Sequence, residues 1–242
     1  MISYDPAVMS QVLKISNSAL YKFPNTTTTV TKAIQVIGTR SIYDLVLAYG
    51  VASAFKDINS DIVDLDKFWE QSVNGALLCK NLAEAVGLKE PEKMFVCGLL
   101  HNLGELVLVQ LNPIEANKFS SISCEDTPLV LQKKHLGFSY VDISFELLKL
   151  WGIPLDILLI VSKTHVSEHI AQRQEENIIQ LAYLFALNNI NRELYASHAG
   201  ITEDMYESLG IDLECVNNAI DFSNLQLMSA LALFSPSTFA VF

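Results

Sequence analysis

Apolar residues recur at helical spacing along most of the chain, and the alternation typical of strands is scarce. The longest stripe belongs to an expected helix that opens at Asp64–Asp66 and ends before Gly87. Its members are Phe68, Ser72, Ala76, Cys79, Ala83 and Val86. Aspartate before a helix and glycine after it satisfy free backbone groups at the two ends. The pattern therefore predicts an all-α chain.

Prolines mark further helix starts, because proline in the first helical turn costs no hydrogen bond. The prolines in this position are Pro6, Pro91, Pro113, Pro128 and Pro154. The helix that starts at Glu90-Pro91 is expected to deliver His101. An amphipathic helix is expected from Val141 to Trp151, ended by Gly152.

The pattern changes after about residue 170. Residues 177–189 are helical and largely apolar, and residues 192–210 are acidic. Two short helices are predicted beyond them, in Leu213–Ile220 and Leu225–Leu233. Residues 191–242 are therefore expected to form a C-terminal helical extension or arm.

Composition narrows the classes of partner. The 242 residues carry a net charge of −11, which argues against nucleic acid and against an anionic membrane surface. No uninterrupted apolar run approaches a membrane span, and Met1–Asp5 shows no basic, cleavable leader. We expect a soluble, cytoplasmic protein.

Cysteine usage gives no metal or disulfide pattern. The four cysteines (Cys79, Cys97, Cys124 and Cys215) lie far apart and form no Cys-x-x-Cys pair. Cys79 and Cys97 sit in apolar helical patterns, as small core residues do. A structural zinc site or a disulfide framework is not expected.

Five strings in one order, over roughly 160 residues, resemble the HDOD domain, a bacterial relative of the HD metal-dependent phosphohydrolases. They are Asp5-Pro6 with Lys14–Tyr21, Ala33–Gly38, Phe68–Ser72, Gly98–Gly104 and Leu147–Pro154. The resemblance implies a multi-helix, HD-like bundle with an HDOD domain over residues 1–190. The family usually carries further helical sequence before its Asp-Pro element, so the resemblance also implies a shortened N-terminal part.

The same resemblance implies a degenerate metal site. Catalytic relatives hold metal with histidines, a His-Asp doublet and a later aspartate. Here Gln71 falls at the first histidine, Asn102 replaces the aspartate beside His101, Tyr140 falls near another histidine, and His165 approximates a last one. An amide lacks the negative charge that a hard divalent cation needs, and without metal no water is activated for hydrolysis. We predict no catalytic residue and no cofactor.

A ligand pocket is nevertheless expected at this place. Its candidate residues are Gln71, His101, Asn102, Glu105, Tyr140 and His165. If an ion binds, the resemblance leaves His101, Glu105 and His165 to hold it. For His101 we favour a buried imidazole, hydrogen-bonded to nearby backbone or to Asn102, over a ligand contact.

Other conspicuous residues have structural interpretations that we favour. His165 and His169 are spaced to chelate zinc, but a solvated helix face near a helix end is the preferred interpretation. Trp69 and Trp151 are expected as core anchors. Asn17-Ser18 is expected to satisfy backbone groups at a turn.

The preferred functional hypothesis is a non-catalytic, bacterial signal-transduction module. It would act by binding another signalling protein, with a small ligand in the degenerate pocket as a further property. The alternative is a phosphohydrolase with a depleted metal site. A third hypothesis is a purely structural unit that forms homo-oligomers, which an exposed apolar face would favour.

Overall fold

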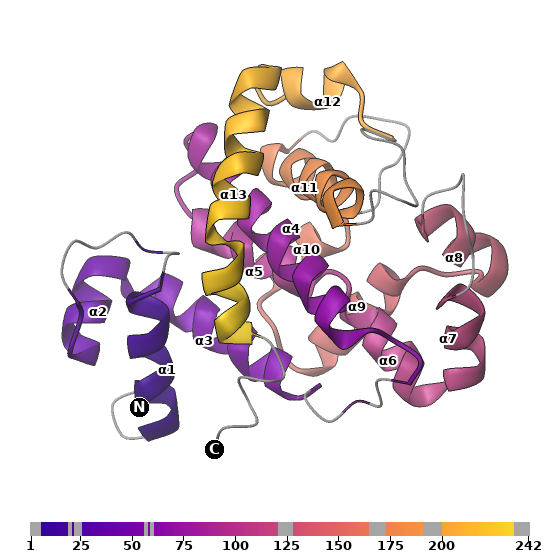
Figure 1. The fold of residues 1–242 in the computed structure, drawn as a ribbon, viewed down its shortest axis with the longest axis horizontal. Helices are drawn as coiled ribbons and strands as arrows, with labels where there is room; N and C mark the ends of the chain where they lie inside the picture. Colours follow the sequence, from indigo (N-terminus) through magenta and orange to yellow (C-terminus); the bar gives the residue numbers. More distant parts are fainter. Residues whose placement is uncertain are drawn as a thin grey trace.

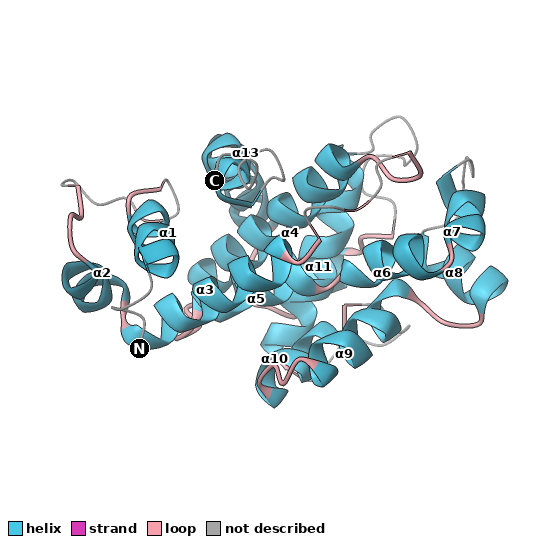
Figure 2. Ribbon diagram, turned by 90° about the horizontal axis from the view of Figure 1, so that it is seen from below, coloured by secondary structure: helices cyan, strands magenta, loops and turns pink. Residues whose placement is uncertain are grey.

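The computed structural model describes residues 6–18, 21, 26–55, 58, 61–120, 128–164, 173–190 and 200–234. Every regular element among these residues is an α-helix, which confirms the all-α prediction (Figure 2). The helices are α1 (Pro6–Ser16), α2 (Val30–Ile37), α3 (Thr39–Ser53), α4 (Leu65–Ala85), α5 (Pro91–Leu100), α6 (Leu103–Leu111), α7 (Pro113–Ser120), α8 (Pro128–Leu136), α9 (Tyr140–Leu150), α10 (Leu155–Val161), α11 (Gln174–Ile190), α12 (Glu203–Glu207) and α13 (Leu213–Phe234).

Helix α4 lies at the centre of the bundle, with α5, α11 and α13 packed against it (Figure 1). Its first turn is capped by Asp64, whose carboxylate accepts a hydrogen bond of 3.0 Å from the backbone N–H of Lys67. Its last turn is followed by Gly87 with a φ of 75°, a left-handed conformation that glycine adopts without strain. Both predicted ends of this helix are confirmed.

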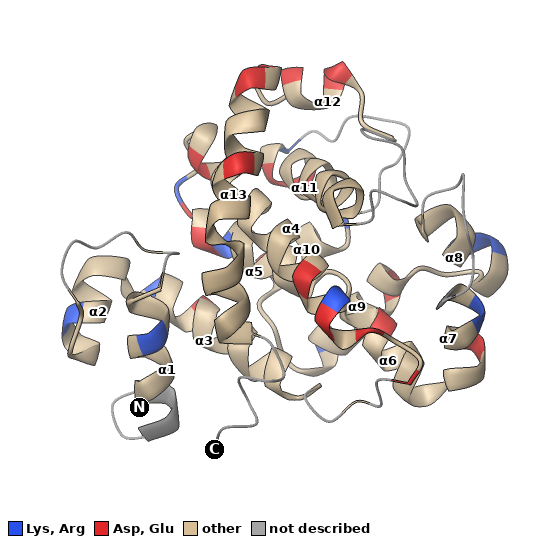
Figure 3. Ribbon diagram, in the orientation of Figure 1, with Lys and Arg blue, Asp and Glu red and all other residues tan. Residues whose placement is uncertain are grey.

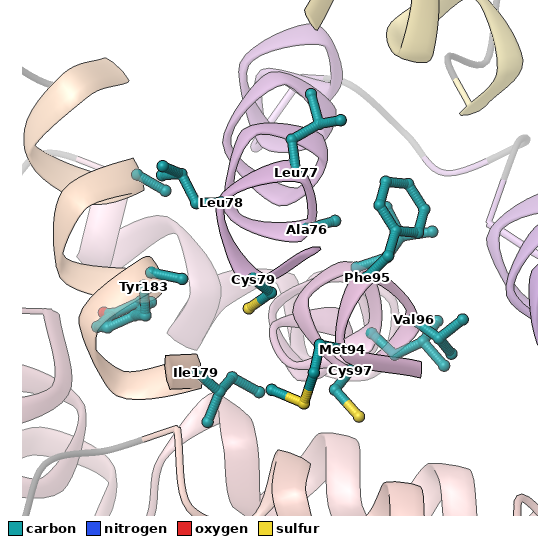
Figure 4. Packing of buried hydrophobic residues seen from close by; sticks show 14 of the residues in the cluster. Ala76, Leu77, Leu78, Cys79, Met94, Phe95, Val96, Cys97, Ile179 and Tyr183 are labelled. Atoms are coloured by element: carbon teal, nitrogen blue, oxygen red, sulfur yellow. The ribbon is translucent and has the colours of Figure 1, made fainter. Parts of the chain in front are cut away.

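The main core fills the space between α4, α5 and α11, as Figure 4 shows. Cys79 and Cys97 are buried there, and burial raises the pKa of the Cys97 thiol well above its ordinary value. Both thiols therefore act as small core residues, as predicted. The expected core position of Trp69 is also confirmed, since this side chain is 1% exposed.

Trp151 departs from the prediction, because 43% of its surface is exposed. Trp151 is the C-cap of α9, and the chain turns away from the helix at Gly152. Its side chain therefore lies at the end of the helix and not on its buried face. Its ring contacts the edge of the core through Phe55, with ring centroids 5.9 Å apart. The buried face of α9 ends at Leu148, three residues earlier.

The C-terminal region corrects a second prediction. Residues 213–234 form one helix, α13, instead of two short ones. Residues 221–224, between the two predicted helices, lie inside it, and Ser223 is fully buried. Its hydroxyl accepts a hydrogen bond of 2.8 Å from the Asn81 amide of α4. The helix continues because these polar groups face partners on α4, which a local pattern does not reveal.

Helices α5 and α6 form the most apolar stretch of the described chain. The segment Pro91–Leu111 is long and apolar enough to cross a membrane, but 78% of its most apolar 18 residues are buried inside the bundle. Packing in the core accounts for this apolar character. The described Lys and Arg residues are scattered over several helices (Figure 3), and the absence of nucleic-acid and membrane partners stays a prediction.

The turn after α1 has the structural role predicted for Asn17. Its amide donates to the carbonyl of Thr27 at 2.8 Å, and its carbonyl accepts from the Thr27 N–H at 2.6 Å. This pair ties the end of α1 to the start of the segment that leads to α2. The other end of the molecule, where α6 to α9 meet α4 and α11, contains the candidate site (Figure 1).

Candidate functional site

The junction between α5 and α6 places the first site residues. Helix α5 ends at Leu100, His101 is its C-cap, and α6 begins at Leu103. Asn102 stands at the N-cap position of α6 without capping the backbone. Its side-chain amide instead donates a hydrogen bond of 2.6 Å to Glu105, one turn further along α6.

His101 has the structural role that we favoured from the sequence. The side chain is 2% exposed, and its Nδ1 lies 2.7 Å from the carbonyl oxygen of Gly98. Because a carbonyl can only accept, Nδ1 carries the proton and Nε2 has the free lone pair. Nε2 is buried without a hydrogen-bond partner among the described residues. Burial lowers the pKa of His101 to about 4.

Glu105 contributes a carboxyl group that resists ionisation. Burial raises its pKa to about 7, and the hydrogen bond from Asn102 offsets only part of that rise. Tyr140 lies close by: burial raises the pKa of its phenol, and the nearby Glu105 raises it further. Glu105 is therefore a carboxyl in an environment that favours its uncharged form near neutral pH.

Asn102, Glu105 and Tyr140 line a cavity of about 480 Å³. The helices that form its walls are α4, α6, α7, α8, α9 and α11, and the α5–α6 junction closes it. Its polar lining residues are Asp64, Lys67, Gln71, Asn102, Glu105, Gln132, Tyr140 and Tyr183. Its apolar lining includes Phe68, Val109, Phe119, Leu131 and Leu187.

Four of the six candidates from the sequence therefore line one cavity: Gln71, Asn102, Glu105 and Tyr140. His101 is not a lining residue, but its ring packs against the edge of Tyr183, with centroids 5.4 Å apart. His165, together with His169, lies outside the described residues.

Sequence reasoning missed three residues that shape the cavity: Phe119, Gln132 and Tyr183. Tyr183 lies in the apolar pattern of α11, where nothing local distinguishes it from core. Gln132 lies in α8 and accepts a hydrogen bond of 2.8 Å from the backbone N–H of Tyr140. No signal in the sequence marks Gln132, because its burial depends on packing that a local pattern does not reveal.

Two glycines allow the helices around the site to approach closely. A Cβ at Gly98 would lie 2.7 Å from the Cα of Ala76 on α4. A Cβ at Gly104 would lie 2.8 Å from the Cβ of Ile143 on α9, and the Gly104 N–H donates to the Ser144 hydroxyl at 2.8 Å. Both glycines belong to the string that carries His101.

The fold is shared by proteins of known structure. A candidate phosphohydrolase from Shewanella amazonensis SB2B matches with a TM-score of 0.73 and 23% identity, over 97% of this chain and 85% of that one. A candidate signal transduction protein from Marinobacter aquaeolei VT8 matches with a TM-score of 0.74 and 22% identity, over 98% of this chain and 54% of that one.

Sequence comparison decides the family, because the model of the HDOD domain matches residues 1–167. The chain belongs to the HDOD family. An HDOD domain protein of unknown function from Geobacter sulfurreducens has the same fold, with a TM-score of 0.69 and 18% identity over 96% of this chain and 84% of that one. An uncharacterised protein from Treponema pallidum is 25% identical over 186 residues, which is 76% of this chain. This HDOD chain spans only 36% of the length of that relative.

Metal-dependent relatives of the fold raise the question of whether an ion fits this site. Among the described residues, no three His, Cys, Asp or Glu side chains lie together so that they could hold a metal ion. Asn102 offers no negative charge, and the carboxyl of Glu105 is already bonded to it. The described side chains of this HDOD chain therefore do not fit a divalent metal of the HD type.

Proposed function

We propose that this HDOD chain is a non-catalytic regulatory module of bacterial signal transduction. It acts in the cytoplasm by binding another signalling protein, and its degenerate pocket binds a small ligand. The hydrogen bond between Asn102 and Glu105 carries the proposal. In this bond the Glu105 carboxyl accepts from a neighbouring amide. Metal-dependent hydrolysis would instead need charged side chains that hold an ion.

The shape of the site supports binding. The cavity lies within the size range of small-molecule sites, about 300 to 1,000 Å³, and its lining mixes aromatic and polar groups as such sites do. A site that has lost its chemistry and kept its cavity is suited to sensing.

One observation favours the alternative, a phosphohydrolase with a depleted metal site. The Nε2 atom of His101 has a free lone pair and no partner among the described residues, as a metal-ligating nitrogen would have before an ion binds. Such an enzyme would use His101 and Glu105, with His165 as a third ligand.

A hydrolysis assay separates the two functions. The purified chain is incubated with Mg²⁺ or Mn²⁺ and with nucleotides or cyclic dinucleotides, beside the variant His101→Ala. We expect no turnover above the no-protein blank for either protein. Turnover by the wild-type chain that His101→Ala abolishes would overturn the proposal and establish the enzyme.

The partner is tested separately, because the chain must bind another protein to act. The tagged chain is used to capture partners from a bacterial lysate, and light scattering after gel filtration gives its own oligomeric state. We expect a specific signalling protein in the captured fraction. A stable homo-oligomer that captures no other protein would instead favour the structural, dimerising role.

A further inference from the structure

The polar groups that face the cavity are not all used within the protein. Asn102 donates through its amide nitrogen to one carboxyl oxygen of Glu105, which leaves the Asn102 Oδ1 and the other Glu105 oxygen. Gln132 accepts through Oε1 from the Tyr140 N–H, which leaves its amide nitrogen to donate. These remaining groups have no hydrogen-bond partner among the described residues. They are also not among the fully buried unpaired atoms, so each has some exposed surface. They are therefore open to a ligand.

The remaining groups are mixed in kind. The Oδ1 of Asn102 accepts, the Nε2 of Gln132 donates, and an uncharged Glu105 can do either. A ligand that fits them carries donors and acceptors on one edge. An alkyl ligand would leave these groups unpaired, and each buried group left unpaired costs binding free energy.

The charges of the lining argue against a strongly charged ligand. Its acidic and basic side chains are Asp64, Lys67 and Glu105. Lys67 is exposed and its charge is offset by that of Asp64, so a phosphate would find no excess of positive charge in the lining. An organic cation gains little, because Lys67 offsets Asp64 and burial favours the neutral form of Glu105.

The aromatic lining favours a flat ligand. Phe119 is half-buried at the cavity and is held edge-on between His135 and Tyr140, with both centroids 6.1 Å away. Phe68, Tyr140 and Tyr183 are further aromatic side chains in the lining, each about as buried as a core residue. Aromatic faces stack on planar rings, as nucleobases do on aromatic side chains.

We infer that the cavity binds an uncharged, planar heteroaromatic ring with a hydrogen-bonding edge, the chemistry of a nucleobase, packed against Phe119 and bonded by Asn102, Glu105 and Gln132. The inference rests on the proposed function, since it takes the cavity as a binding site without turnover. It adds the class of ligand to that function. It also implies that a phosphate group on the ligand weakens binding.

Calorimetry on the full chain at pH 7 tests the ligand class. The probes are adenosine, guanosine, cytidine and uridine, their 5′-monophosphates, and ribose as the control without a base. We expect at least one nucleoside to bind with a stoichiometry of one, its monophosphate to bind more weakly, and ribose not to bind. No binding by any nucleoside, or tighter binding by the monophosphate, overturns the inference.

Matched variants test the place of binding. Phe119→Ala is expected to weaken the binding of that nucleoside by about tenfold or more, since the stacking surface is lost. Phe138→Ala removes a phenylalanine outside the cavity, 41% exposed, and should leave binding unchanged. If Phe119→Ala does not fold, Glu105→Leu removes the carboxyl and should cause a similar loss. Equal binding by the wild type and the folded cavity variant overturns the inference.

Turnover is measured in the same samples, so that failure of the proposed function and failure of the inferred ligand class can be told apart. Hydrolysis of a bound monophosphate would overturn the proposed function. Absence of both binding and hydrolysis would overturn only the ligand class.

Discussion

Asn102 and Glu105 share a hydrogen bond of 2.6 Å, and Asn102 is the residue that the resemblance to HD enzymes aligns with the aspartate of their His-Asp doublet. At the scale of single residues, this bond explains how the pocket tolerates a carboxyl without a cation. The amide nitrogen satisfies one oxygen, and burial favours the proton on the group. Replacement of aspartate by asparagine thus does more than delete a charge, because the new side chain also supplies a donor.

Glu105 should make stability depend on pH. Folding raises its pKa from 4.5 to about 7, so the folded state holds this proton more tightly than the unfolded state does. Its contribution to stability is complete below about pH 4.5 and is lost as the pH rises through 7. Glu105→Gln has no proton to lose, so between pH 5 and pH 8.5 the variant should gain roughly 2 kcal/mol relative to the wild type.

Urea unfolding at the two pH values measures this difference. An equal gap between wild type and Glu105→Gln at both pH values would show that the carboxyl ionises as freely in the folded state as in the unfolded chain.

The sequence predicted part of this site, for two different reasons. His101, Asn102 and Glu105 lie in one short string, so their proximity is a matter of helix geometry, whereas Gln71 on α4 and Tyr140 on α9 were expected only from the resemblance to the family. Phe119 and Tyr183 come from other helices, brought to the cavity by packing. Trp151 shows the opposite error, because an apolar stripe does not reveal where the helix leaves the core.

At the scale of elements, close helix contacts at glycine hold the site together. Gly104 lies in the first turn of α6, where its N–H bonds to Ser144 of α9. Gly98 brings α5 against Ala76 of α4. These two contacts fix both sides of the junction that presents Asn102.

Gly104→Ala should destabilise the protein by about 3 kcal/mol, because the added methyl group overlaps the backbone of Tyr140 and the Cβ of Ile143. Gly50→Ala is the matched control, since a Cβ there meets no atom within 4 Å. In the interior of α3 this change should stabilise by about 0.5 to 1 kcal/mol. Thermal unfolding compares them, and similar effects of both changes would contradict the close-packing account.

Element boundaries followed from the sequence where one residue decides them. Asp64 caps α4 and Gly87 ends it because the backbone there needs an acceptor and a left-handed turn. Inside α13, by contrast, Ser223 accepts a hydrogen bond from Asn81, a residue of α4 more than a hundred positions earlier. Ser223 resembles a helix break in the sequence because its contact with Asn81 is not visible there.

Helix α13 should depend on its end as well as its middle. Phe234 is fully buried and its ring lies 5.7 Å from that of Phe95 on α5. Phe234→Ala should therefore cost about 3 to 5 kcal/mol in the free energy of unfolding. Leu225→Ala removes a side chain of the same helix that is 80% exposed, and it should cost less than about 1 kcal/mol. Equal losses in chemical denaturation would show that α13 does not depend on this contact.

At the scale of the whole molecule, the bundle keeps the shape of an HD-type fold while the described residues of its pocket lack a metal-binding set. A cavity whose lining includes amides, phenols and a carboxyl with a raised pKa is suited to reversible binding. This HDOD chain shares its fold with a candidate phosphohydrolase, whereas the chemistry of its site is its own.

Equilibrium metal binding tests that central claim most directly. The purified chain, Asn102→Asp and His101→Ala are dialysed against Mn²⁺ and their metal content is measured by mass spectrometry. The account predicts far less than one ion per wild-type chain, and a rise only when Asn102→Asp restores the charge. One ion per wild-type chain, lost in His101→Ala, would contradict it.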